Sequence, residues 1–104
     1  MPQYDVFANP SRSGAHGIPY VVVIQSDLLG ALATRLTIPL AEFDSGVRVP
    51  TALCPVITVK GKRFHALAHY TAPLPARELR RPVANVAAQA SALVSAMDAV
   101  LSGV

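Results

Sequence analysis

The segment Tyr20–Ile24 constrains the fold more than any other part of the chain, because it reads YVVVI without a polar residue. A continuous run of aromatic and β-branched residues predicts a strand that is covered on both faces and is therefore central to a sheet. Other segments also have strand-like patterns, at residues 3–7, 34–40, 53–59 and 63–70. The link Lys60-Gly61-Lys62 predicts a hairpin between the last two. The chain is therefore expected to be mainly β.

The last third of the chain has a different pattern. Pro73 and Pro75 predict a break in regular structure, and we expect the segment up to Arg81 to cross over the sheet irregularly. From Pro82 onward, apolar residues recur at spacings of three and four, which predicts a C-terminal helix that ends before Gly103. The buried stripe of this helix is expected to contain Val83, Val86, Ala87, Ala90, Leu93, Val94, Met97, Val100 and Leu101. The opposite face carries small and weakly polar residues, Ala96 among them, and suits close approach by another protein.

Length and composition predict one domain over residues 1–104 that associates with a second copy. The chain is 52% hydrophobic and 14% charged, so few charges remain to cover a monomer. Cys54 is the only cysteine and lies in an apolar run, as expected of a buried thiol in a reducing compartment. The first residues, MPQYDVFANP, do not resemble a secretory signal, and polar residues interrupt the segment 83–104 too often for a membrane span. We therefore expect a cytoplasmic protein without a membrane partner.

Basic residues are concentrated in one stretch of a chain whose net charge is +3. The stretch contains Lys60, Lys62, Arg63, Arg77, Arg80 and Arg81, with Glu78 as its only acidic residue. Such a concentration attracts phosphate groups or acidic protein segments. The alternative is a solvated face that serves solubility.

A search for catalytic motifs finds no glycine-rich phosphate loop, no G-x-S-x-G sequence and no CxxC pair. His65 and His69 are expected on one face of a strand, where four residues span about 13 Å and a single metal ion cannot join them. They are either surface histidines or an acid/base pair beside the basic residues. Ser26 and Cys54 have no partner base that the sequence identifies. We therefore predict no catalytic residue, no metal and no cofactor.

Residues 18–40, which read IPYVVVIQSDLLGALATRLTIPL, closely resemble a stretch of the CcdB family of gyrase-poisoning toxins. The resemblance is carried by Gln25-Ser26-Asp27 followed by two aliphatic residues, and by Ile38-Pro39-Leu40 at the end of the next strand. Leu53-Cys54-Pro55-Val56 is similar to the Leu-Tyr-Pro-Val element of the family, with Cys in place of Tyr. A C-terminal helix followed by Gly103 and Val104 also matches the family's terminus.

The resemblance implies an antiparallel sheet related to SH3-like barrels, of the kind shared by CcdB and MazF toxins, with one C-terminal helix and a two-fold dimer. It implies that the GyrA subunit of DNA gyrase is trapped in its DNA-cleavage complex without any catalysis by the toxin. An antitoxin with a disordered, often acidic tail would neutralise the toxin, and the two together would bind operator DNA and repress their operon. The residues implied in gyrase binding are Leu28, Leu29, Asp98, Leu101, Ser102, Gly103 and Val104.

The chain departs from the family at its C-terminus. Ser102 stands where the family has the tryptophan that stacks on gyrase, and the chain contains no Trp. Asp98 replaces an Asn of the family and adds a negative charge. Two alternatives therefore stay open. One is a MazF-like endoribonuclease that uses Arg63, His65 and His69, and the other is a degenerate toxin that retains only its antitoxin and DNA complexes.

Overall fold

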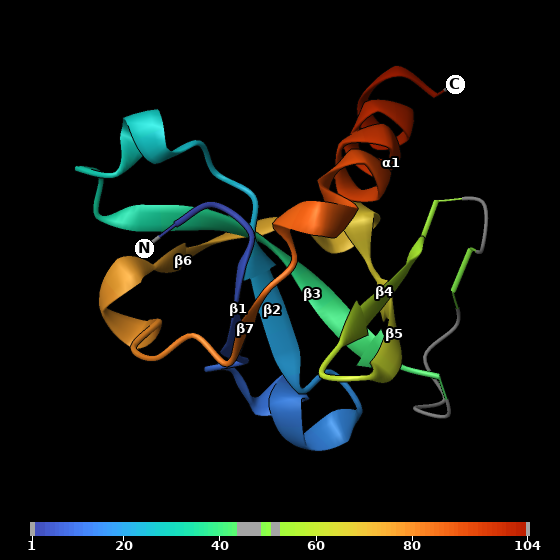
Figure 1. Cartoon of the computed structure of the whole chain (residues 1–104), viewed down its shortest axis with the longest axis horizontal. Helices are drawn as coiled ribbons and strands as arrows, with labels where there is room; N and C mark the ends of the chain where they lie inside the picture. Colours follow the sequence, from blue (N-terminus) through green and yellow to red (C-terminus); the bar gives the residue numbers. More distant parts are fainter. Residues whose placement is uncertain (1, 44–48, 51–52, 104) are drawn as a thin grey trace.

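The computed structural model describes residues 2–43, 49–50 and 53–103 (Figure 1). In chain order the elements are β1 (Asp5–Ala8), η1 (Arg12–His16), β2 (Tyr20–Val23), η2 (Asp27–Leu29), β3 (Thr34–Glu42), β4 (Val56–Val59), β5 (Lys62–Ala66), η3 (Ala68–Tyr70), β6 (Ala72–Pro75), η4 (Ala76–Glu78), β7 (Ala84–Asn85), η5 (Ala87–Gln89) and α1 (Ala90–Ser102). The η elements are short 3₁₀ turns. The expected mainly β chain with one C-terminal helix is confirmed for these residues.

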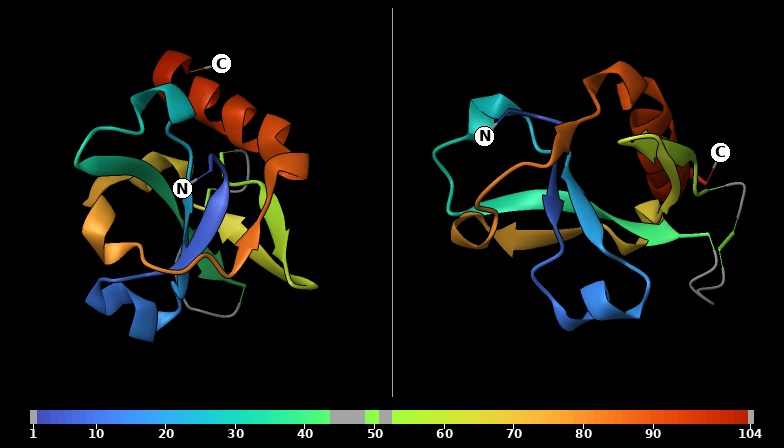
Figure 2. Two further views of the ribbon diagram at one scale, coloured as in Figure 1. Left: turned by 60° about the vertical axis from the view of Figure 1, so that its left-hand side comes forward. Right: turned by 60° about the horizontal axis from the view of Figure 1, so that its bottom comes forward.

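The strands form one strongly curved antiparallel sheet in the order β4-β5-β3-β2-β1-β7, and β6 pairs separately with β3. The long strand β3 organises this sheet, because different parts of it pair with different neighbours. Its residues 37–40 pair with β2, residues 40–42 with β5, and residues 34–37 with β6. The sheet is therefore bent into a nearly closed barrel, with α1 lying beside its opening (Figure 2).

The strand β2 is covered on both faces, as its unbroken apolar sequence predicts. Val22 lies in the main core, together with Phe64 and with Leu93 of α1. Val21 and Val23 point the other way and pack with Phe7 in a second cluster. Because successive side chains of a strand alternate between its faces, a strand with apolar clusters on both sides needs the continuous apolar run that the sequence contains.

The expected break at Pro73 and Pro75 is wrong, since both residues lie in β6. The backbone N–H of Ala76 donates to the carbonyl of Ala33, which sets the phase of the β3–β6 ladder. In that phase the residues whose N–H groups face β3 are Ala72, Leu74 and Ala76, whereas positions 73 and 75 face outward. Proline costs no ladder hydrogen bond at outward positions of an edge strand. The two prolines therefore fit an edge strand. Because proline has no backbone N–H, the outer side of β6 has no N–H donor at positions 73 and 75.

The expected helix start at Pro82 is also wrong. Ala84 and Asn85 form β7 and pair with β1, and the α-helix begins only at Ala90. The side chain of Asn85 explains this start, because its Nδ2 donates to the buried carboxylate of Asp5 at 2.9 Å and its Oδ1 accepts from the N–H of Ala87 at 2.9 Å. An asparagine that bonds forward to the backbone in this way favours a turn over continued helix.

The buried stripe of α1 differs from the predicted stripe at several positions. Leu93 and Ala96 are the buried residues of the helix, although Ala96 was expected on the opposite face. Val94 and Leu101 were expected in the core but are exposed. The reason is the late helix start, because a stripe counted from Pro82 includes residues that belong to a strand and a turn. Gly103 does end the helix as predicted, with a left-handed φ of 73°. Among the described residues, no helix combines the length and apolar character that crossing a membrane requires.

Gln89 joins the two ends of the sheet and so nearly closes the barrel. Its Oε1 accepts from the N–H of Thr58 at 2.9 Å, and its Nε2 donates to the carbonyl of Thr58 at 2.8 Å. Thr58 lies in the edge strand β4, and Gln89 follows closely after β7 at the other end of the sheet. The amide therefore occupies the backbone groups of Thr58 that a neighbouring strand would otherwise use.

Candidate binding surface

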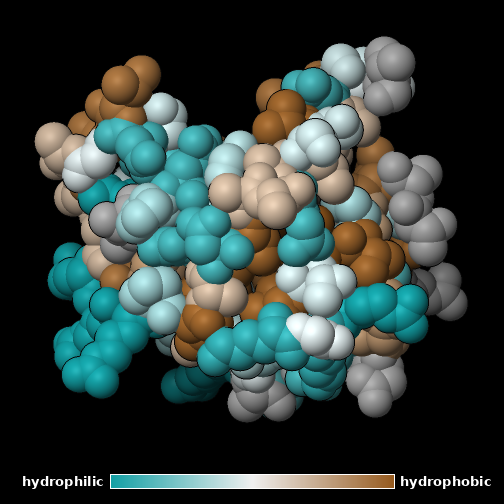
Figure 3. Space-filling view, viewed as in Figure 1, coloured by the Kyte–Doolittle hydropathy of each residue, from teal (hydrophilic) through white to brown (hydrophobic). Residues whose placement is uncertain are grey.

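Two exposed apolar segments project from the same side of the molecule. In Figure 1, η2 and the C-terminal end of α1 rise on either side of a gap, and Figure 3 shows hydrophobic atoms on both projections. Leu28 of η2 is 94% exposed, and Leu101 of α1 is 79% exposed. We call the surface formed by Leu28, Leu29, Val94, Asp98 and Leu101 the binding face. Large apolar side chains that stay exposed on one side of a molecule suggest a contact with another protein.

The triplet Gln25-Ser26-Asp27 holds η2 in place. Gln25 donates through Nε2 to the carbonyls of Leu29 and Thr34, and its Oε1 accepts from the N–H of Leu36 at 3.0 Å. The Ser26 hydroxyl accepts from the N–H of Leu28, and the Asp27 carboxylate accepts from the N–H of Gln3 at 2.8 Å. Each polar residue of the triplet thus satisfies backbone groups around η2. This arrangement fixes the turn that presents Leu28 and Leu29.

Arg35 supports the segment that follows η2. Its guanidinium donates to the carbonyls of Gly30 at 2.7 Å and Thr34 at 2.9 Å, and also to the carbonyl of Leu32. A guanidinium has several donors in one plane and can therefore hold several carbonyls of a loop at once. Arg35 thus orders the loop between η2 and β3.

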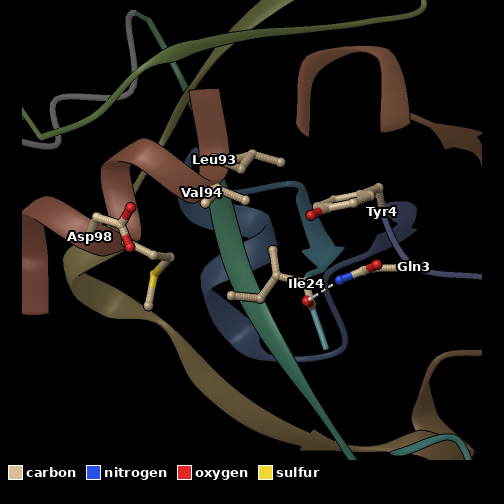
Figure 4. A pocket seen from close by; sticks show the side chains of 7 residues that line it. Gln3, Tyr4, Ile24, Leu93, Val94 and Asp98 are labelled. Carbon is tan, nitrogen blue, oxygen red and sulfur yellow. Dashed lines mark hydrogen bonds between the residues drawn. The ribbon is translucent and has the colours of Figure 1, made fainter. Parts of the chain in front are cut away.

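A pocket of about 220 Å³ opens between α1 and the N-terminal segment. In Figure 4, Leu93, Val94 and Asp98 line it from α1, while Tyr4, Gln3 and Ile24 line it from the other side. Tyr4 has a φ of 70°, which is rare for a residue with a side chain, and this turn directs the chain into β1. Sequence reasoning missed this pocket, because its walls come from segments that are about 70–95 residues apart and the φ of Tyr4 leaves no pattern in the sequence.

The end of α1 carries the remaining residues that the resemblance assigned to gyrase binding. Asp98, Leu101, Ser102 and Gly103 are exposed, and Val104 lies outside the described residues. The Ser102 hydroxyl donates to the carbonyl of Asp98 at 2.6 Å, so its side chain turns back along the helix. The structure therefore brings Leu28, Leu29 and the end of α1 to one side of the molecule, although they lie about 70 residues apart in the sequence.

The predicted run of basic residues is divided into two groups. Lys60, Lys62 and Arg63 lie at the β4–β5 hairpin, where positive φ angles at Lys60 and Gly61 form the tight turn that was predicted. Arg77 lies in η4, and Arg80 and Arg81 follow it. Figures 1 and 2 show the hairpin and η4 on opposite sides of the central strands. Sequence proximity alone could not show this separation, because β6 carries the chain across the molecule.

The hairpin group is partly engaged within the chain. Lys62 forms an ion pair with Glu42 at 3.7 Å. The Arg63 guanidinium lies 5.1 Å from the ring centre of Phe43, and the His65 ring stacks on the same Phe43 ring at 4.2 Å. Phe43 is itself exposed. This basic and aromatic surface can accept an anionic or planar partner.

The expectation that His65 and His69 share a strand face is wrong. The strand β5 ends at Ala66, and His69 lies in the 3₁₀ turn η3. His69 instead lies beside Cys54, with 3.6 Å between Nδ1 and Sγ, and its ring contacts Tyr70. The chain turns after β5, where the N–H of Tyr70 donates a hydrogen bond to the carbonyl of Leu67, and the strand therefore ends earlier than expected. The three residues of the ribonuclease alternative are therefore not aligned along one strand.

Cys54 has a histidine neighbour that the sequence did not identify. The thiol is buried, as predicted, with 3% of the residue exposed. Burial raises the pKa of the Cys54 thiol, because the thiolate loses solvation, and a hydrogen bond from the backbone of Ala68 offsets this in part. A raised pKa disfavours the nucleophilic thiolate form. The arrangement thus favours a packing role for Cys54 within the cluster of Ala41 and Leu67.

Within the described part of the chain, His, Cys, Asp and Glu side chains form no group of three that could hold a metal ion. A comparison with protein families matches residues 3–103 to the family described as CcdB protein. A comparison of the chain with individual curated proteins found no match. Because the family match covers nearly the whole chain, and the barrel and C-terminal helix agree with the fold that the resemblance implied, the protein belongs to the CcdB family of toxins from toxin–antitoxin systems.

Proposed function

We propose that this toxin binds the GyrA subunit of DNA gyrase through the binding face and traps the DNA-cleavage complex, without catalysing a reaction itself. The observation that carries the proposal is the pair of exposed leucines, Leu28 of η2 and Leu101 of α1, whose elements project from one side of the molecule (Figure 1). These are positions that the resemblance to gyrase-poisoning toxins assigns to the target.

The way in which η2 is held supports a binding role. A turn that is fixed by the side chains of Gln25, Ser26 and Asp27 loses little conformational freedom when a partner binds. The hydrogen bonds of Gln25 and Ser26 go to backbone groups of η2 and of the start of β3, so they hold the turn that presents Leu28 and Leu29. Binding energy from these leucines is then not spent on ordering the turn.

We further propose that the toxin acts as a cytoplasmic homodimer and is neutralised by an antitoxin with a disordered acidic tail. Two basic groups could attract such a tail, one at Lys60, Lys62 and Arg63 and the other at Arg77, Arg80 and Arg81. Toxin and antitoxin together would bind operator DNA and repress their operon. Light scattering in moderate salt tests the dimer, because we expect about twice the chain mass of 10.9 kDa.

Gyrase, ATP and supercoiled plasmid incubated with the purified toxin test the main proposal. We expect linear plasmid after denaturation of the protein, which reports a trapped cleavage complex. The matched variants are Leu28→Ser and Leu101→Ser, which should reduce the linear product at least tenfold, because each removes an exposed apolar contact. Val56→Ser is the control, since Val56 is also exposed but lies on β4.

A parallel digest of messenger RNA tests the ribonuclease alternative. Suppose that the toxin cuts RNA and that a His65→Gln, His69→Gln variant with an unchanged melting temperature does not. The ribonuclease alternative would then replace the gyrase proposal. If neither linear plasmid nor cut RNA forms, the result favours a degenerate toxin that retains only its complexes with antitoxin and DNA. We expect the histidine variant to inhibit growth as strongly as the original chain.

A further inference from the structure

The pocket on the binding face combines apolar walls with one ionised group at its rim. Ile24, Leu93 and Met97 supply apolar surface, and Asp98 supplies a carboxylate (Figure 4). None of the residues that line the pocket is Lys or Arg. Asp98 is also the only ionisable residue among the 13 residues of α1. The rim of the pocket is therefore negative, although the chain has a net charge of +3.

No described residue neutralises this carboxylate. The ion pair found in the described residues joins Lys62 of β5 to Glu42 of β3, and neither residue lines the pocket. Across the pocket, Asp27 adds a second negative charge where it accepts a hydrogen bond from the backbone of Gln3, a pocket residue. The guanidinium of Arg35 already donates to three backbone carbonyls of the segment that follows η2. A positive charge from a partner would therefore meet a carboxylate without an internal counterion.

We propose that the pocket takes a lysine or arginine side chain from the gyrase segment that the toxin binds. This inference rests on the proposed function and adds the chemistry of the target group. Lysine and arginine have long aliphatic stems that bury against apolar surface while their charged ends stay at a polar rim. Here the stem lies between Ile24, Val94 and Met97, and the charged end reaches Asp98. Asp98 is then a specificity residue that favours basic over neutral or acidic target segments.

Binding to the isolated GyrA subunit, measured by calorimetry at low and high salt, tests the role of Asp98. We expect Asp98→Asn to weaken binding about three- to tenfold and Asp98→Lys to weaken it further, since reversal of the charge repels the target cation. The difference between the original chain and Asp98→Asn should shrink in 0.5 M salt, about the range where exposed charges are screened. Glu78→Gln is the matched control, because it removes one exposed negative charge from η4 and should leave affinity unchanged.

A second measurement examines the pocket without gyrase. Butylguanidinium, titrated against the isotope-labelled toxin, should shift the resonances of Val94, Met97 and Asp98, whereas pentanol at the same concentration should shift them less. Asp98→Asn should remove the preference for the cation. The substitution replaces one exposed side chain by another of the same shape, so the fold is retained, and a melting curve checks this.

The outcomes separate this inference from the proposed function. If the toxin binds GyrA and Asp98→Asn binds as tightly or more tightly, the pocket does not take a cation and the gyrase proposal stands. If the toxin does not bind GyrA but the pocket prefers butylguanidinium through Asp98, the gyrase proposal fails and the cation pocket belongs to another target. Equal shifts with pentanol and butylguanidinium would overturn the inference in either case.

Discussion

The two ends of α1 differ in what they contact. At its start, Leu93 is buried in the main core, and Gln89, just before the helix, bonds to both backbone groups of Thr58 on β4. At its end, Leu101 is exposed, and Ser102 and Gly103 form hydrogen bonds with the preceding turn of the same helix. One end thus closes the barrel, whereas the other projects beyond it.

Together with the proposed function, this difference predicts that stability and target binding depend on separate residues of one helix. Substitutions at the start should unfold the protein and reduce binding only as a consequence. Substitutions at the end should alter binding while the free energy of unfolding hardly changes. The following predictions test this separation in order of their expected effect on stability.

Leu93→Ala should have the largest effect. Leu93 is 1% exposed, and truncation of a buried leucine to alanine typically lowers the free energy of unfolding by about 2–5 kcal/mol, through lost burial and the cavity left behind. Urea denaturation followed by circular dichroism measures the change. Leu101→Ala is the matched control on the same helix and should change stability by less than about 0.5 kcal/mol. Similar losses for the two leucines would contradict the separation.

Gln89→Ala should have an intermediate effect. It removes two hydrogen bonds to Thr58 and leaves the edge of β4 open, so we expect a loss of about 1–2 kcal/mol in the free energy of unfolding. Gln89→Glu should fall between the two proteins, because a carboxylate can accept from the Thr58 N–H but cannot donate to its carbonyl. Ser91→Ala, an exposed helix position, is the control. If Gln89→Glu is as stable as the original chain, the hydrogen bond that Gln89 donates to the Thr58 carbonyl contributes nothing to the free energy of unfolding.

Deletion of residues 102–104 should have a small effect on stability and a large effect on binding. The deletion removes the bond from Ser102 to Asp98 and the one from the N–H of Gly103 to Ala99, both at an exposed helix end. We expect the melting temperature to stay within a few degrees and gyrase inhibition to be lost. Calorimetry and the plasmid assay measure the two effects. Intact inhibition by the shortened chain would place the target contact elsewhere.

The sequence predicts the strands better than the segments that join them. The apolar run of β2 and the Lys60-Gly61 turn have local causes, namely burial on both faces and positive φ angles, and both predictions are confirmed. The start of α1 was predicted too early because the cause of β7 is the pairing of Asn85 with Asp5, which are 80 residues apart. Likewise, Pro73 and Pro75 are compatible with a strand only because β3 pairs with the opposite side of β6, where no proline N–H would be needed.

The candidate site was predicted in part, and that prediction came from the family resemblance and not from local sequence patterns. Leu28, Leu29 and the end of α1 were identified by resemblance, whereas the pocket between them was not predicted. Tyr4 and Ile24 resemble core residues in the sequence, and only the turn at Tyr4 places them opposite Val94 and Asp98. A site whose walls come from three distant segments leaves no local pattern. The separation of the basic residues into two groups escaped prediction for the same reason.

Ser102→Trp should hardly change stability but should strengthen binding. Ser102 is exposed, and its loss costs one hydrogen bond within the helix, so we expect the free energy of unfolding to stay within about 0.5 kcal/mol. An aromatic anchor at an interface is commonly worth about 2 kcal/mol, which corresponds to about a thirtyfold gain in affinity for GyrA. Val56→Trp adds the same ring to a distant exposed strand and controls for general stickiness. A folded Ser102→Trp protein without a gain would show that the end of α1 does not contact gyrase in the manner that the resemblance implies.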